Sequence, residues 1–371
     1  MWRFISPQIV FGKDSVEFLE RFGDRRCLIV TDEIIDKLGY CSLVSKYLKN
    51  YKVTAMKPEE PSIDDAFKLA DELREMNPEI IIALGGGSVI DVAKTGRILM
   101  EADIKPEQIT PFTDLGEYGY KGETALVAIP TTSGTGSEAT WAIVLKDRKE
   151  GRKVVMANEK AMPEYAIVDP AYVYSMPESL VALTGFDALS HAVEAYLSSF
   201  SNPFSDALAI YAISEILDNF SKSYMGDVDA RERMHISATM AGIAFSNSQV
   251  GIVHALAHST GGLLGIPHGL AVAVFLNPVL EFCRERGVER LNELVLRIDS
   301  DIITDIERFE KQFGIAEWMC DLEIEKHGDE IVRRAMEDSC IVTGPFVPDE
   351  SDLVEIIERV VKRCMRKKFS E

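Results

Sequence analysis

Short apolar runs rich in β-branched residues alternate with longer stretches of helical period in the first half of the 371-residue chain. Such runs, bounded by polar and turn residues, predict strands over residues 26–30, 51–55, 79–84, 124–129 and 165–168. Between them, apolar residues recur at helical spacing and predict helices over 63–75 and 89–100. Strands that alternate with helices are typical of an α/β domain with a parallel sheet.

The pattern changes after residue 176. Helical periods then dominate, for example over 203–220, 230–245 and 352–365, and no convincing strand follows. Just before the change, residues 147–168 are expected to form a hairpin or an irregular excursion that ends on the last strand. Because proline suits the start of a helix and disrupts a strand, we place the boundary at Met176 and Pro177. The sequence therefore predicts an α/β domain over 1–176 and an all-helical domain over 177–371.

Four of the six histidines and one aspartate fall into three short blocks of the helical part. Two blocks are pairs with a spacing of four, Asp187 with His191 and His254 with His258, and the third is His268 in an Ile-Pro-His-Gly turn. Residues four apart stand one above the other on the same helix face, close enough to share one ion. Two such helices could enclose a metal.

Each member of this set also has an ordinary structural interpretation. Asp187 lies three residues after Thr184 and could be the acid of a capping box, and an isolated helical histidine is more often a core or surface group than a ligand. Taken together, however, the spacings favour a metal site, because so few histidines would rarely gather in this way by chance. His235 and His327 lie outside the blocks, and we assign them structural roles.

Charge and cysteine usage restrict the class of partner. A formal net charge of −20 argues against nucleic acid or an anionic membrane, so small molecules are the expected partners. The N-terminus resembles no signal peptide, and no apolar stretch reaches the roughly 18 residues of a membrane span. The six cysteines are scattered without a Cys-x-x-Cys motif, which indicates reduced thiols in the cytoplasm.

A glycine-rich loop follows the predicted strand 79–84 and opens a helix. It consists of Gly85, Gly86, Gly87 and Ser88. Free backbone N–H groups and the positive end of the helix dipole favour a phosphate at such a place, and glycine lets the ligand approach the backbone. The spacing is not that of the usual dinucleotide fingerprint, because its third glycine would fall at Ile90. A tight turn without a ligand is the alternative interpretation.

Two further features lie at predicted strand ends. The loop from Pro130 to Ser137 holds five hydroxyl residues and two glycines, which suits a polar ligand, although an ST-turn with a helix cap at Ser137 would also explain it. Asp32 ends the first predicted strand, where folds of this class bind ligands. Its carboxylate could accept bonds from ribose hydroxyls and would repel a 2′-phosphate, so NAD would be preferred and NADP remain possible. A helix N-cap is the plainer role for Asp32.

These motifs together closely resemble the iron-containing, or group III, alcohol dehydrogenase family. The resemblance runs nearly end to end and includes the glycine loop, the hydroxyl loop, the Asp-x-x-x-His block and the Pro-His-Gly turn, in the same order. It implies a dinucleotide-binding N-terminal domain and a metal-binding C-terminal domain. The ligands that it implies for one divalent metal, usually Fe²⁺ and sometimes Zn²⁺, are Asp187, His191, His254 and His268.

The resemblance also implies roles for other residues. His258 corresponds to a histidine beside the metal and the nicotinamide that is not a ligand, and we expect it to transfer a proton, because imidazole exchanges protons near neutral pH. Residues implied at the cofactor are Asp91, which joins the glycine loop, and Thr131, Thr132, Thr135 and Lys153. One departure is Val89 in place of a common proline, for which we expect little consequence.

The expected activity is a metal-dependent alcohol dehydrogenase or aldehyde reductase that uses NAD(P)(H) and a small primary alcohol or aldehyde. A divalent ion would polarise the reacting oxygen. Three alternatives remain. The first is a polyol dehydrogenase of the glycerol dehydrogenase type, but proteins of that type generally lack the residue that matches His191. The second is a lyase like dehydroquinate synthase, which would need a cluster of basic residues that we do not find. The third is a protein that binds a metal or nucleotide without catalysis. We expect a cytoplasmic homodimer or higher homo-oligomer.

Overall fold

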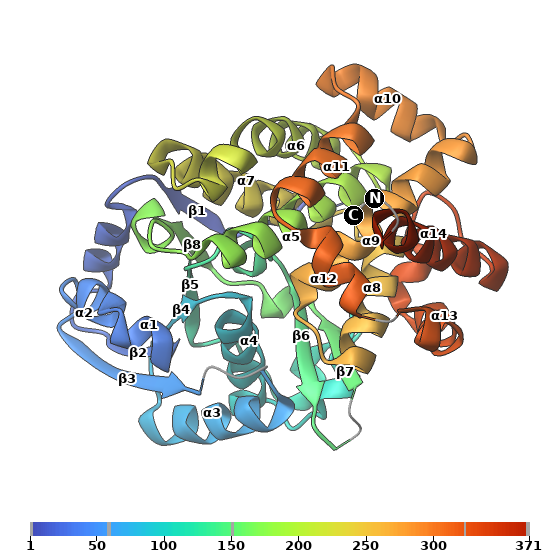
Figure 1. Cartoon of the computed structure of the whole chain (residues 1–371). Helices are drawn as coiled ribbons and strands as arrows, with labels where there is room; N and C mark the ends of the chain where they lie inside the picture. The colour runs from blue at the N-terminus through green and yellow to red at the C-terminus, as the bar shows by residue number, and fades with distance from the viewer. Residues whose placement is uncertain (1–2, 58–60, 150–151, 323, 369–371) are drawn as a thin grey trace. The chain divides into compact units, whose positions relative to one another are not determined.

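The computed structural model describes residues 3–57, 61–149, 152–322 and 324–368 (Figure 1). The chain divides into two compact units, Met1–Ser175 and Met176–Glu371, so the division falls one residue before the boundary expected from the sequence. Each unit is described by itself.

The first unit is built on a six-stranded sheet in which all neighbouring strands are parallel. In spatial order its strands are β1 (Gln8–Phe11), β8 (Tyr165–Val168), β5 (Ala125–Pro130), β4 (Ile80–Gly85), β2 (Arg26–Asp32) and β3 (Asn50–Met56). The predicted α/β class with a parallel sheet is confirmed. Strand β1 was not predicted, because four half-exposed residues at a sheet edge give too short an apolar signal.

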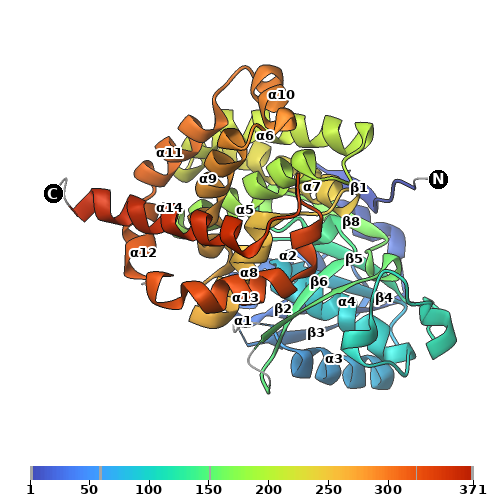
Figure 2. The same cartoon turned by 90° about the vertical axis from the view of Figure 1, so that its right-hand side faces the viewer.

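Helices cover both faces of this sheet (Figure 2). They are α1 (Glu33–Lys37), α2 (Tyr40–Ser45), α3 (Ile63–Met76) and α4 (Gly87–Glu101). Successive strand residues point to opposite faces. Thus Ile81 and Ala83 pack with residues of α3 and α4, whereas Ile80 and Ile82 join the core that contains α2. Two buried faces explain why the strands are continuously apolar. An antiparallel hairpin of β6 (Ala142–Asp147) and β7 (Arg152–Ala157) begins five residues before the expected excursion over 147–168, which contains only its second strand in full.

The carboxyl ends of three neighbouring strands lie side by side. The Thr31 hydroxyl of β2 donates to the Leu84 carbonyl of β4 at 2.8 Å, and Gly85 of β4 lies opposite Pro130 of β5. The chain reverses its direction across the sheet here, because β3 lies on one side of β2 and β4 on the other. In open α/β sheets such a switch point is where ligands bind. This edge carries Asp32 and the starts of both loops.

The second unit contains only helices among the residues described. They are α5 (Glu178–Leu197), α6 (Pro203–Tyr224), α7 (Val228–Ser246), α8 (Ile252–Leu264), α9 (His268–Glu285), α10 (Glu289–Ile298), α11 (Ile302–Gln312), α12 (Ile315–Asp321), α13 (Gly328–Glu337) and α14 (Glu350–Lys368). Helix α5 is buried along most of its length and packs against α6, α7 and α9. Within the described part of the chain, we find no helix that is long and apolar enough to cross a membrane.

Candidate metal centre and cofactor-binding loops

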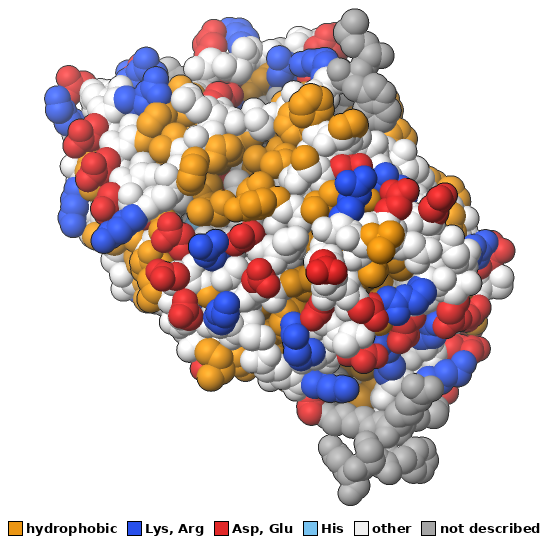
Figure 3. All heavy atoms as spheres, turned by 90° about the horizontal axis from the view of Figure 1, so that it is seen from above, with side chains coloured by type: hydrophobic (Ala, Val, Ile, Leu, Met, Phe, Trp, Pro, Cys, Tyr) orange, Lys and Arg blue, Asp and Glu red, His pale blue; other side chains and the backbone are white. Residues whose placement is uncertain are grey.

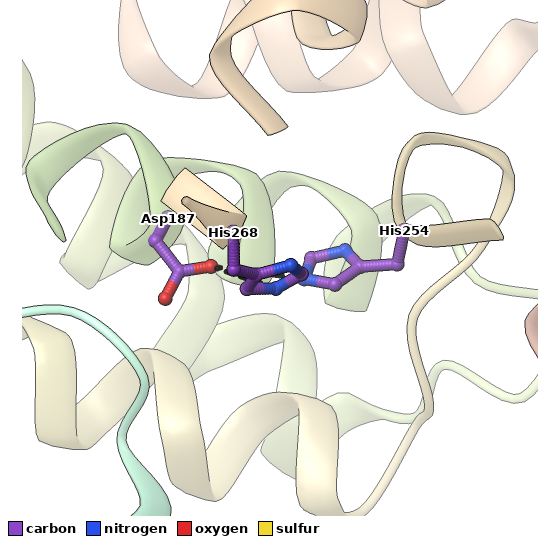
Figure 4. A group of neighbouring side chains, drawn as sticks. All are labelled: Asp187, His254 and His268. Carbon is purple, nitrogen blue, oxygen red and sulfur yellow. Dashed lines mark ion pairs between the residues drawn. The ribbon is translucent and has the colours of Figure 1, made fainter. Parts of the chain in front are cut away.

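Three helices of the second unit bring the predicted ligands around one carboxylate oxygen. Asp187 and His191 lie one turn apart on α5, His254 lies in α8, and His268 is the first residue of α9. The Nε2 atoms of His191, His254 and His268 lie 3.8, 3.9 and 3.6 Å from Asp187 Oδ1. Figure 4 shows Asp187, His254 and His268 pointing toward one another from separate segments. The structure therefore brings all four side chains together.

Ring stacking orients His191 within this group. Its imidazole lies between the ring of Phe245, at a centroid distance of 4.3 Å, and the ring of His254, at 4.6 Å. Both contacts are nearly parallel. Ligating atoms of Asp187, His254 and His268 all lie within 4.8 Å of one another, whereas His191 joins the group through its distance to Asp187.

Glu194 fixes the orientation of His254. Its Oε2 lies 2.5 Å from the Nδ1 of His254, and its two oxygens also accept the backbone N–H groups of Val253 and His254. Burial raises the pKa of Glu194 to about 7, while its bonds from backbone amides act in the opposite direction. Burial also lowers the pKa of His254 to about 3, so this imidazole is neutral at pH 7. With Nδ1 bonded to Glu194, the lone pair of Nε2 faces the centre.

Two glycines allow the helices to approach closely at this place. A Cβ atom on Gly269 would lie 2.4 Å from the carbonyl oxygen of Leu183 in α5. A Cβ atom on Gly251 would lie 2.9 Å from the Cα of Gly344 and 3.1 Å from the Oε1 of Glu194. Side chains at either position would push the starts of α9 or α8 away from α5, and the ligand residues with them.

The donor set fits a divalent ion. One carboxylate and three imidazoles match the oxygen and nitrogen donors that Fe²⁺ and Zn²⁺ accept. The buried Nε2 of His254 has no hydrogen-bond partner in the described part of the chain, which is costly for a polar atom unless something binds it. The Nε2 atoms of His191 and His268 also lie close to Asp187 Oδ1, as that of His254 does.

His258 lies beside the centre but has a different partner. Its Nδ1 lies 3.0 Å from the Oδ2 of Asp338, and its ring stacks on that of His268 at a centroid distance of 5.3 Å. Asp338 also accepts the backbone N–H of Cys340 through Oδ1, at 2.8 Å. Burial would raise the pKa of Asp338, but the bonds and charge of His258 and the bonds from Cys340 hold it below its ordinary value.

The two loops of the first unit pack against each other. Helix α4 begins at Gly87, and its N-cap, Gly86, provides no side-chain cap. A Cβ atom on Gly87 would lie 2.7 Å from the Thr135 hydroxyl, and one on Gly86 would lie 3.4 Å from the Thr132 methyl. The Thr131 amide donates to the Gly85 carbonyl at 3.1 Å. Glycine backbone, threonine side chains and a helix N-terminus therefore meet in one place, a combination that suits a phosphate.

A buried network attaches the hydroxyl loop to α4. Asp91 accepts the Ser137 hydroxyl at 2.5 Å and the Val144 amide at 2.9 Å. Lys94 donates to Ser137 at 2.8 Å and to Thr140 at 3.1 Å. Burial lowers the pKa of Lys94 to about 8, against the charge of Asp91. Both oxygens of Asp91 thus accept bonds from the last residue of the hydroxyl loop or from a residue after it, and this carboxylate attaches the loop to α4.

The remaining predicted cofactor residues are separate from this network. Asp32 caps α1, because its Oδ1 accepts the amides of Ile34 and Ile35 at 2.8 and 3.0 Å. Ser88 is exposed in the first turn of α4, and Lys153 is half-buried on β7. The structure shows the helix-cap role of Asp32 and leaves its second oxygen, Oδ2, as a possible acceptor for a ligand.

Sequence reasoning missed the groups that support the site. Glu194 stood inside a recognised motif, three residues after His191, and that proximity was the available signal. Asp338 and Cys340 had none, because Asp338 is one of 60 acidic residues and lies 80 positions from His258. Ser137 was considered as a helix cap, but the cap of the 3-10 turn is Gly136, and Ser137 instead bonds to Asp91 and Lys94.

Comparisons with known proteins agree across both units. Residues 6–170 match the family model described as iron-containing alcohol dehydrogenase, and residues 181–361 match the C-terminal model of the same family. An NADPH-dependent butanol dehydrogenase of Clostridium saccharobutylicum is 35% identical, over 97% of this chain and 98% of that protein. An NAD-dependent methanol dehydrogenase of Bacillus methanolicus is 30% identical, over 96% and 99%.

A solved structure has the same fold. The iron-containing alcohol dehydrogenase of Thermococcus thioreducens is 30% identical, covers 98% of this chain and all of its own, and superposes with a TM-score of 0.88. The likeness thus extends over both the α/β unit and the helical unit.

Proposed function

Because the chain belongs to the iron-containing alcohol dehydrogenase family, and is therefore an NAD(P)-dependent oxidoreductase that acts on alcohols, we propose that it interconverts a small primary alcohol and its aldehyde at one metal centre. We assign the metal to Asp187, His191, His254 and His268. The observation that carries this proposal is the convergence of three imidazole Nε2 atoms on Asp187 Oδ1.

The protein side chains prepare this centre for chemistry. With four protein donors, a substrate oxygen would be a fifth donor, a coordination number that catalytic sites can reach. A bound divalent ion supplies Lewis acidity there, which favours loss of the hydroxyl proton from an alcohol and attack on an aldehyde carbonyl. Glu194 keeps His254 in the tautomer that a metal needs, and Phe245 and His254 hold the ring of His191 between them.

We place the cofactor phosphates at the start of α4. Gly85 ends β4 there and Gly86 and Gly87 begin the helix, with Ser88 in the first turn and Thr131, Thr132 and Thr135 beside them. Asp91 and Lys94 hold the hydroxyl loop in position through their hydrogen bonds with Ser137. The nicotinamide supplies the hydride acceptor or donor. Lys153 remains a further proposed contact.

His258 is proposed to move the proton. Asp338 bonds its Nδ1 and so leaves Nε2 as the atom that exchanges a proton with the substrate hydroxyl or with solvent. As a fifth metal ligand, His258 would occupy the place that the substrate oxygen needs.

The proposed preference for NAD depends on Asp32. A carboxylate at the end of β2 accepts from a ribose 2′-hydroxyl and repels a 2′-phosphate. The relative from C. saccharobutylicum is named NADPH-dependent and that from B. methanolicus NAD-dependent, so membership of the family does not decide the matter. Asp32→Gly should relax the preference, whereas Asp36→Gly in the same short helix should leave it unchanged. Equal or better wild-type turnover with NADP(H) would refute the proposed preference.

We also propose that the protein acts in the cytoplasm as a homodimer or higher homo-oligomer. None of the six cysteines forms a disulfide in the described part of the chain, as in a reducing compartment. Figure 3 shows a face on which hydrophobic side chains gather into a patch among scattered charges, and patches of this kind mark contact surfaces. Light scattering coupled to size-exclusion chromatography tests the oligomer, and a monomer would contradict it.

The experiment that tests the proposed function is a substrate panel. Anaerobically purified protein, with its metal content determined, is assayed with alcohols and aldehydes of two to six carbons and with NAD(H) or NADP(H). We expect turnover with primary alcohols and their aldehydes and little with glycerol. Turnover of polyols alone, or no change in nicotinamide absorbance with any substrate, would contradict the proposal.

A further inference from the structure

A second group of metal-ligating side chains lies in the helical unit and includes none of the four proposed ligands. His258 comes from α8, and Asp338 and Cys340 come from the segment that opens the 3-10 turn Ser339–Val342. One ligating atom from each residue lies within 4.8 Å of the ligating atoms of the other two. The side chains of His258 and Asp338 are only 9% and 12% exposed.

The donors of this group differ in kind from those of the first centre. An imidazole nitrogen, a carboxylate oxygen and a thiol sulfur suit Zn²⁺ and related cations with affinity for sulfur, and the first centre offers no sulfur. We propose that His258, Asp338 and Cys340 form a second site for such a divalent cation, with Zn²⁺ as the physiological candidate and water completing its shell.

Local charge favours a cation at this position. The negative charges of the Asp338 carboxylate and the Cys340 thiolate together neutralise the two positive charges of a divalent cation, and His258 binds as a neutral ring. On binding, the Cys340 thiol loses its proton to solvent, and metal–ligand bonds replace the Nδ1–H···O bond between His258 and Asp338. The Nδ1 proton of His258 passes through solvent to Nε2 of the same ring, so the imidazole stays neutral.

Occupation of this site has a consequence for turnover, which depends on the proton-transfer role proposed for His258. A cation held by His258 prevents the ring from exchanging protons. The rings of His258 and His268 are stacked, so the second cation would also lie next to a ligand of the first. Metal in excess of one equivalent per chain should therefore inhibit the enzyme, although the first equivalent is required.

Cobalt distinguishes the two sites because only the second contains sulfur. Protein that holds one Zn²⁺ per chain is titrated with Co²⁺ while absorption and turnover are recorded. We expect thiolate-to-cobalt charge-transfer absorption in the near ultraviolet that saturates at about one added equivalent, with turnover falling in parallel. Cys340→Ser should remove this absorption and raise the Zn²⁺ concentration that halves its own turnover by at least about tenfold.

Cys320→Ser is the matched control, since Cys320 is a half-buried thiol on α12 outside the cluster, and it should behave as wild type. Absence of charge-transfer absorption in the wild type would overturn the second site, whatever the activity. Absorption that persists in Cys340→Ser would do the same. Absorption that depends on Cys340 without loss of turnover would support the site and overturn its inhibitory consequence. Absence of turnover before any cobalt is added would contradict the proposed function instead.

Discussion

One oxygen atom, Oδ1 of Asp187, is the point on which the proposed metal centre converges. Three imidazoles lie within 3.9 Å of it, each from a position that the sequence pattern had singled out. The spacing of four predicted that Asp187 and His191 share a helix face, because that relation is local. It could not show that Glu194 holds His254 or that Asp338 holds His258, because those contacts join segments 60 and 80 residues apart.

The first prediction concerns Glu194. Glu194→Gln should weaken metal affinity by about 10- to 100-fold, because the ligand His254 loses the carboxylate that fixes its tautomer. His254→Ala should lose more affinity while the protein stays folded, since the helices also bury their own apolar faces. Chelator competition with elemental analysis gives the affinities. Glu178→Gln, at the start of the same helix, is the control, and unchanged metal affinity in both Glu194→Gln and His254→Ala would refute the assignment.

The second prediction concerns His258. Its replacement by Gln should leave metal content near that of the wild type and lower turnover by about 10²-fold, the low end of what general acid–base catalysis contributes. Metal content and the pH dependence of turnover are measured on the same preparation. Loss of the metal would make His258 a ligand, and an unaltered rate and pH profile would leave it only a packed helical residue.

Short elements decide the geometry of the cofactor site. Helix α4 can start against the hydroxyl loop only because Gly87 has no Cβ atom, and the buried pair of Asp91 and Lys94 attaches that loop to the same helix. Strong periods predicted the strands and helices of this region, whereas the four-residue β1 was missed and the first strand of the hairpin, Ala142–Asp147, lies before the hairpin or excursion expected over 147–168. Propensity and periodicity are weakest where packing by distant segments defines the element.

At this scale, Gly87→Ala should raise the KM for the cofactor by about 10- to 100-fold with metal content unchanged. The added Cβ would lie 2.7 Å from the Thr135 hydroxyl and would separate the two loops. Gly262→Ala is the matched control, because nothing lies within 4 Å of its added Cβ. Steady-state kinetics with saturating substrate measure the effect, and an unchanged KM would place the cofactor phosphates elsewhere.

The stability of the whole molecule should depend on pH through His235, which is buried in α7. Burial lowers its pKa from 6.5 to about 3 in the folded protein. Below pH 6.5 the unfolded chain therefore takes up a proton that the folded chain excludes, and stability falls as the pH falls. This residue alone should lower the free energy of unfolding by about 2 kcal/mol as the pH falls from 6.5 to 5. Urea unfolding of wild type and His235→Gln at both pH values measures the difference, and an equal loss in both would contradict it.

The fold class and the family of the whole chain could be predicted from sequence because its motifs follow one another in the family's order. The identity of the alcohol could not, because single side chains placed by tertiary packing decide it, and the preference for NAD stays a prediction that rests on Asp32. For the molecule as a whole, the proposed function requires one metal ion per chain for dehydrogenase turnover.

The initial rate of aldehyde-dependent NADH oxidation, measured anaerobically while metal-free protein is titrated with Fe²⁺, tests this claim most directly. The rate should rise linearly from near zero and break at one Fe²⁺ per chain, and Asp187→Ala should show no such rise. A rate that is independent of added Fe²⁺ and of other divalent metals, or a break that persists in Asp187→Ala, would contradict the account.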